Sequence, residues 1–144
     1  MTYKEWNAAI MVTSGVLVSA WVAFDALFGV DGWRGSVAHV AADMLWAIGY
    51  VVAFNILATI VVTILVSIVQ REELKDEKSD ERDHAVAAKA MRNGYFVLSI
   101  GCVAILVLLA FGAAPVLAVY ALFGASMLAG VVFAASQLVY YRIG

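Results

Sequence analysis

The sequence predicts an all-α polytopic membrane protein, a bundle of four transmembrane helices. Hydrophobic residues fill 65% of its 144 positions and charged residues only 14%. A typical soluble domain has about 45–50% apolar and about 25% charged residues. A soluble fold of this length has too little interior to bury so much apolar surface. Two further observations agree: four apolar stretches are long enough to span a bilayer, and Lys and Arg are distributed asymmetrically.

The first half of the chain predicts a hairpin of two spans within a single membrane domain. A spanning helix needs about 20 predominantly apolar residues. The first span covers approximately residues 7–28 and is interrupted only by Asp25. The second covers approximately 40–69 without a charge except Asp43, and its helix is expected to begin near Ser36. A short outer loop near 29–36 joins the two spans.

The second half predicts another hairpin. Residues 93–141 contain no charged side chain over 49 positions, which is too long for one helix and suits two. The run Gly112-Ala113-Ala114-Pro115 interrupts this stretch. Because glycine readily ends helices and proline is tolerated in a helix's first turn, we expect spans near 94–111 and 115–140.

A polar segment, residues 70–92, connects the two hairpins. It holds six basic and seven acidic side chains and is therefore almost neutral. Ser79 is a suitable N-cap, and acidic residues follow it in the first turn, where the helix dipole favours them. From Asp80 a helix can run directly into the third span. The segment is either a solvated, charged hairpin or a docking surface for a cytoplasmic partner.

The distribution of basic residues predicts the orientation. Four spans place both termini and residues 70–92 on one side, where eight of the nine Lys and Arg residues then lie. Arg34 alone lies opposite. Because cytoplasmic loops are enriched in Lys and Arg, we expect both termini in the cytoplasm and a multi-pass location in the cell (inner) membrane.

The acidic run Asp80-Glu81-Arg82-Asp83, followed by Lys89 and then by residues 95–98 (Tyr-Phe-Val-Leu), resembles a group of small bacterial membrane proteins of unknown function. In that group an acidic "DERD" turn links two transmembrane hairpins. The specific similarity covers about a fifth of the chain. It implies a non-enzymatic accessory or regulatory role, since some members are encoded beside helix-turn-helix regulators, and it brings no catalytic residues.

The sequence contains none of the common catalytic or phosphate-binding motifs, so we do not expect an enzyme. Cys102, deep in the third span, is expected to be buried and structural. His39 and His84 are predicted on opposite sides of the membrane, which argues against haem, and no other cofactor is indicated. The expected partners are the lipid bilayer, a protein at the central hairpin and a further copy of the chain. A net charge of -2 gives no reason to expect nucleic acid.

The candidate site is a polar cluster at the outer end of the first hairpin. Ionisable side chains in membrane segments are costly and usually face a bundle interior or a water-filled cavity. His39 and Asp43 are four residues apart and share a helix face. Asp25 is expected at a similar depth on the preceding helix. Together they could bind a cation such as Zn²⁺ or Mn²⁺, or pass a proton through His39. The alternative is that His39 and Asp43 are hydrated in the outer headgroup region, while Asp25 extends toward that region or pairs with Arg34.

Asn55 lies in the middle of the second span and predicts an interhelical hydrogen bond, with a pore-lining role as the alternative. Small residues also recur every fourth position in the first and fourth spans, a pattern that allows helix backbones to approach closely. These repeats are Gly15, Ser19 and Ala23, and Ser126, Gly130 and Ala134.

Two functions follow as hypotheses. The first is an accessory or regulatory membrane protein that acts through its central hairpin and its helix faces. The second is a small cation- or proton-linked transporter or channel subunit that uses Asp25, His39, Asp43 and Asn55. Four spans are few for a monomeric transporter, so the second function also requires an oligomer.

The predicted orientation can be tested with a reporter that is active only in the cytoplasm. Because Lys and Arg concentrate on the side of the termini, the reporter is expected to be active after Arg71 or Gly144 and silent at Gly32. Activity at Gly32 together with silence after Arg71 would reverse the orientation.

Overall fold

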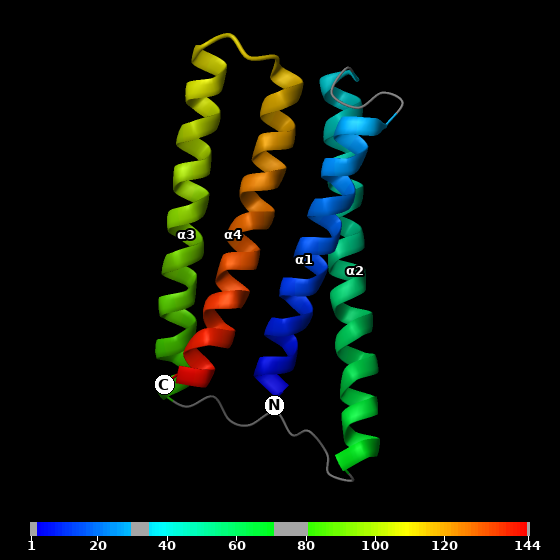
Figure 1. Ribbon diagram of the computed structural model, residues 1–144, viewed down its shortest axis with the longest axis vertical. Coiled ribbons are helices and arrows are strands. Elements are labelled where there is room, and N and C mark those ends of the chain that lie inside the picture. The colour runs from blue at the N-terminus through cyan, green and yellow to red at the C-terminus, as the bar shows by residue number, and fades with distance from the viewer. Residues whose placement is uncertain (1–2, 30–34, 71–80, 144) are drawn as a thin grey trace.

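The computed structural model describes residues 3–29, 35–70 and 81–143, and these residues form four helices joined up and down (Figure 1). All four are long and apolar enough to cross a membrane. The predicted all-α membrane bundle is thereby confirmed. Both chain termini lie at the same end of the bundle, called here the termini end. The helices are α1 (Tyr3–Phe28), α2 (Val37–Gln70), α3 (Glu81–Ala110) and α4 (Pro115–Ile143).

The sequence placed three helices within a few residues of their observed bounds. The larger difference is in α3, which begins at Glu81 rather than near residue 94. The charged residues before the third span are therefore part of its helix. This agrees with the expectation that a helix can run from Asp80 directly into that span. The proposed cap Ser79 lies outside the described residues.

Two of the helix boundaries follow from local chemistry. The Ser36 hydroxyl accepts a hydrogen bond of 3.2 Å from the backbone N–H of His39, which caps the start of α2. At the end of α3, Gly112 adopts a φ of 84°, which glycine reaches without steric cost. The N–H groups of Gly112 and Ala113 then bond the carbonyls of Leu109 and Leu108, each at 3.0 Å, which closes the helix in a Schellman motif.

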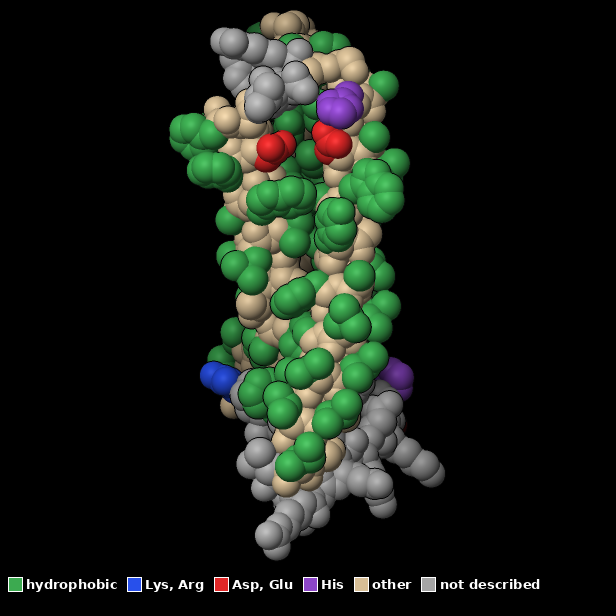
Figure 2. All heavy atoms as spheres, turned by 90° about the vertical axis from the view of Figure 1, so that its right-hand side faces the viewer, with side chains coloured by type: hydrophobic (Ala, Val, Ile, Leu, Met, Phe, Trp, Pro, Cys, Tyr) green, Lys and Arg blue, Asp and Glu red, His purple; other side chains and the backbone are tan. Residues whose placement is uncertain are grey.

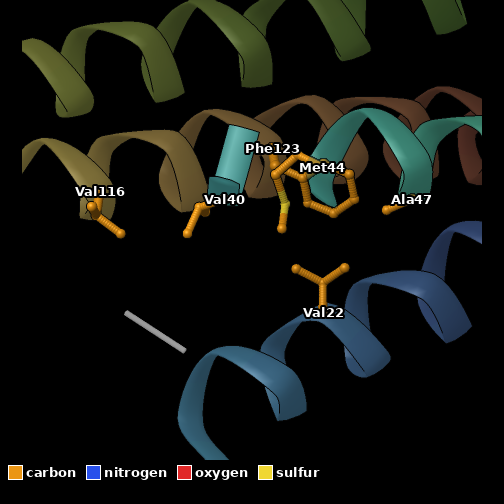
Figure 3. Close-up of a cluster of buried hydrophobic side chains, with 6 residues drawn as sticks. All are labelled: Val22, Val40, Met44, Ala47, Val116 and Phe123. Atoms are coloured by element: carbon orange, nitrogen blue, oxygen red, sulfur yellow. The ribbon is translucent and has the colours of Figure 1, made fainter. Parts of the chain in front are cut away.

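The helices stand in the order α3, α4, α1, α2 across the view of Figure 1, with α4 and α1 in the middle. Among the described residues α4 packs against each of the other three helices, whereas α3 has extensive contact with α4 alone. A buried cluster toward the end opposite the termini joins α1, α2 and α4 (Figure 3). In it Phe123 and Met44 lie side by side, and Val22 points toward them from α1.

Glycine permits the close contact between α3 and α4. A Cβ added to Gly101 would lie 2.6 Å from the Cβ of Ala125, and one added to Gly94 would lie 3.0 Å from the carbonyl oxygen of Ala129. Helix association in lipid depends on such packing, because lipid tails are as apolar as the helix surfaces.

The small residues predicted to mediate helix contacts have mixed positions. Gly15 is buried, and an added Cβ there would lie 2.7 Å from a methyl group of Val131, so this contact joins α1 to α4 within the chain. Ala134 is also buried. Ser126 and Gly130 are exposed, and no atom lies within 4 Å of a Cβ built on Gly130.

Large hydrophobic side chains cover the outside of every helix, and Figure 2 shows them along the face formed by α1 and α2. The most apolar window of α2 contains no buried residue. Cys102 was expected to be buried, but its thiol is exposed on the surface of α3. Such a surface is compatible with a lipid environment and with no aqueous one.

The packing of α3 on α4 can be tested at Gly101. Gly101→Leu is expected to lower the free energy of unfolding by about 1–3 kcal/mol, because the new side chain has no space against Ala125. The matched control is Gly124→Leu on α4, where no atom lies within 4 Å of an added Cβ. Thermal unfolding of the detergent-solubilised protein measures both variants. Equal stability losses would show that Gly101 is not at a helix contact.

Candidate functional site

Polar side chains join α1 to α2 in the middle of the membrane. The Asn55 side-chain amide donates hydrogen bonds of 2.8 Å to the Ser14 hydroxyl on α1 and to the carbonyl of Val51. Ser14 is only 1% exposed. The prediction that Asn55 forms an interhelical hydrogen bond is therefore supported by the geometry. The sequence did not identify Ser14 as its partner, because a serine within an apolar span carries no distinguishing signal.

Asn55 also has an unused acceptor. Its Oδ1 atom is buried, and no group in the described part of the chain donates to it. A buried polar atom without a partner carries a desolvation cost of about 1–3 kcal/mol. Asn55 is consequently both an interhelical contact and a buried acceptor without a donor among the described residues.

A second polar contact lies nearer the termini end of the same pair of helices. The Thr59 hydroxyl donates a hydrogen bond of 2.9 Å to the Asn7 side-chain oxygen. Together with the Asn55–Ser14 bond it forms a polar seam between α1 and α2. Both bonds hold α2 in register against α1, on a helix that otherwise exposes most of its surface to lipid.

The predicted outer cluster lies at the opposite end of the bundle. The Nε2 atom of His39 is 3.6 Å from the Oδ2 atom of Asp43, as their four-residue spacing predicts. Their side chains are 59% and 48% exposed. Figure 2 shows acidic and histidine side chains gathered near the upper end of the face formed by α1 and α2.

Tyr120 on α4 connects this cluster to the rest of the bundle. Tyr120, near the start of α4, lies at the same end of the bundle as Asp25, near the end of α1, and Asp43, near the start of α2. The Tyr120 side chain packs against the buried cluster that contains Val22 and Met44. Two carboxylates and a phenol, from three helices, thus converge at one end of the molecule. Tyr120 was not predicted, because nothing in the sequence distinguishes it from an interfacial tyrosine.

An aromatic layer fixes the depth of the outer cluster. Trp21 on α1 contacts Tyr50 on α2 edge to face, with 6.4 Å between ring centroids, and Trp46 stacks near Tyr50 at 6.3 Å. Trp and Tyr concentrate at the membrane–water interfaces. At ~1.5 Å per residue, Asp25 lies about 6 Å beyond Trp21, and Asp43 lies about 4 Å beyond Trp46 and about 10 Å beyond Tyr50. Both carboxylates therefore lie on the side of the aromatic layer away from the middle of the bundle, which favours the interfacial interpretation.

The geometry limits two chemical roles of the cluster. No group of three or more His, Cys, Asp or Glu side chains is arranged to hold a metal ion within residues 3–29, 35–70 and 81–143. Asp43 and Asn55 are also separated by about 18 Å of helix at ~1.5 Å per residue. Buried Met44 and Ala47 lie between them. The outer cluster and the amide of Asn55 are thus two separate polar regions, with apolar packing between them.

A third polar contact joins α3 to α4 at the termini end. The Asn93 side-chain amide donates hydrogen bonds of 3.1 Å to the Ser136 hydroxyl and to the Tyr140 hydroxyl. Asn93 was predicted only as the first residue of a charge-free stretch. An amide side chain at the edge of a charge-free stretch, like the amide of Asn55 in the middle of a span, was the feature of the sequence that could have indicated an interhelical hydrogen bond.

No family model, curated protein or solved structure matches the chain.

The polar seam can be tested with a double-mutant cycle on Ser14→Ala and Asn55→Leu. We expect a coupling energy of about 0.6 kcal/mol, the average for interhelical hydrogen bonds in a membrane protein. The free energy of unfolding in a denaturing detergent titration measures each variant. The matched pair is Thr13→Ala with Asn55→Leu, because the Thr13 hydroxyl bonds its own helix at Ala9. Additive effects in both pairs would show that Asn55 does not bond α1.

Proposed function

We propose that this chain is a non-enzymatic accessory or regulatory protein of the cell (inner) membrane, which presents the first three turns of α3 to a cytoplasmic protein partner. The observation that carries the proposal is the rigid placement of these charged turns. They belong to one continuous helix, Glu81–Ala110, and one side of it is packed on α4.

The first turns of α3 have two distinct sides. Val86, Ala90 and Gly94 are buried and recur every four residues, so they form one stripe against α4. The opposite side is exposed and carries charged, apolar and aromatic side chains together. This docking face consists of Glu81, His84, Ala88, Met91, Arg92 and Tyr95.

The composition of the docking face supports a protein partner. Met91 is 63% and Tyr95 68% exposed. Aromatic residues, Met and Arg are enriched in protein–protein interfaces. Because the helix is already formed and held by α4, a partner would not have to order it. The resemblance to small membrane proteins with an acidic DERD turn points to the same segment.

A second function, an oligomeric cation- or proton-linked transporter or channel subunit, has narrower support. The unsatisfied Oδ1 of Asn55 and the His39–Asp43 pair favour it. The apolar packing between these regions opposes a continuous polar path, and therefore we place it second.

The docking face can be tested by site-specific photo-crosslinking in intact cells. A photoreactive amino acid at Ala88, the centre of the face, is expected to give one discrete protein adduct. The same amino acid at Val103, which is 60% exposed farther along α3, is expected to give none. Because charge complementarity steers association, Arg92→Glu should reduce the adduct several-fold.

Two results would contradict the proposed function. The first is an equal yield of protein adducts at Ala88 and Val103, which would show non-specific contact. The second is a proton or cation flux in vesicles containing the purified protein that Asp43→Asn abolishes. That flux would support the transporter function instead.

A further inference from the structure

A cleft lies between α3 and α4 at the termini end, away from the polar seam and the outer cluster. It has a volume of about 330 Å³. Its position is set by the start of α3 and the last turns of α4. Six residues line it: Arg82, Ala85, Val86, Lys89, Tyr140 and Ile143.

Two cations from one helix line this cleft. Arg82 and Lys89 are seven residues apart, which is about two helical turns and places them on the same side of α3. The acidic neighbours of Arg82 in the sequence do not line the cleft. At about 100° per residue, Glu81 and Asp83 project to either side of it, and Glu81 belongs to the docking face.

The cleft is preorganised by contacts with α4. The Arg82 guanidinium donates a hydrogen bond of 3.5 Å to the carbonyl of Tyr141. The Lys89 ammonium lies 6.0 Å from the centroid of the Tyr140 ring. Tyr140 is itself fixed, because its hydroxyl accepts the bond from Asn93. These contacts place both cations on the side of α3 that borders α4.

The walls and depth of the cleft match the boundary between headgroups and acyl chains. The lining residues Ala85, Val86 and Ile143 are apolar. Apolar walls suit the glycerol-ester region of a lipid, whereas a free phosphate ion has no need of them. Lys89 is four residues, one helical turn, before the charge-free stretch begins at Asn93. Long basic side chains near helix ends extend toward the headgroups, and tyrosines concentrate at the same level.

We propose that this cleft binds the phosphate-bearing headgroup of an anionic phospholipid. Arg82 and Lys89 would bind the phosphate, and the ring of Tyr140 with its apolar neighbours would cover the glycerol region. Basic pockets between transmembrane helices are a recognised way to bind such headgroups. The site goes beyond the proposed docking function and uses a different side of α3.

Native mass spectrometry of the intact, detergent-solubilised protein tests the site. The probes are phosphatidylglycerol and phosphatidylcholine with identical acyl chains. We expect a single phosphatidylglycerol adduct at concentrations where phosphatidylcholine leaves none. Arg82→Gln and Lys89→Gln should each weaken the adduct about fivefold. This factor corresponds to the attraction of about 1 kcal/mol between one basic residue and an anionic membrane.

The matched control is Arg142→Gln, which removes an exposed cation at the same end that does not line the cleft. Arg142→Gln is expected to weaken the phosphatidylglycerol adduct less than about twofold, because a charge outside the cleft contributes only to the overall electrostatic potential of the protein. Lys89→Gln keeps the Arg82–Tyr141 bond, so its loss of lipid cannot be attributed to loss of that contact. Circular dichroism and size-exclusion chromatography check that each variant is folded.

Three results would overturn the proposal. One is equal retention of the two lipids by the wild-type protein. Another is an equal loss of phosphatidylglycerol in Arg142→Gln and Lys89→Gln. The third is displacement of the lipid by inorganic phosphate at the lipid's own concentration, which would assign the cleft to a soluble phosphate compound.

Discussion

Close van der Waals contact with α4 is the interaction on which the arrangement of this protein depends. In a bilayer the hydrophobic effect does not drive helices together, because lipid and helix surfaces are equally apolar. The helices are therefore held together mainly by close packing between their surfaces. Gly94 and Gly101 bring α3 against α4, Gly15 brings α1 against α4, and Phe123 reaches the cluster shared with α2. Removal of α4 would leave α3 without an extensive partner in the described structure.

Hydrogen bonds have a different role from this packing. Asn55 and Thr59 join α1 to α2, and Asn93 joins α3 to α4. Each of these bonds lies within one hairpin. The contact between the hairpins includes the close approach of Gly15 to Val131 and the buried cluster of α1, α2 and α4. An interhelical hydrogen bond adds little free energy, but it selects one register, because a shifted helix would leave an amide unpaired in lipid.

The sequence was sufficient for the fold because composition and length act on whole segments. Four charge-poor stretches and a Gly-Pro break are local signals, and they located three of the helices closely. The extent of α3 was less evident. Its first three turns are charged and lie outside the apolar stretch, so only helix continuity from Asp80 indicated them.

Most of the residues that contact one another in the polar sites could be identified only from the three-dimensional structure. His39 and Asp43 were predictable as a pair because they share one helix face. Tyr120 and Ser14 were not, since each comes from another helix at a depth set by packing. The cations of the cleft were visible in the sequence as two basic residues among many. Only the position of Tyr140 against Lys89 distinguishes them from the rest of a solvated, charged segment.

The central position of α4 has a consequence for biosynthesis. Of the four helices, α4 is synthesised last, yet it is the one that every other helix packs against. The α1–α2 hairpin can form its amide bonds as soon as both helices are inserted. α3 must wait in the bilayer with its glycine-lined side facing lipid or the insertion machinery. Assembly of the bundle is therefore completed only after α4 has been inserted, and without α4 the α1–α2 hairpin and α3 would have no extensive contact with each other.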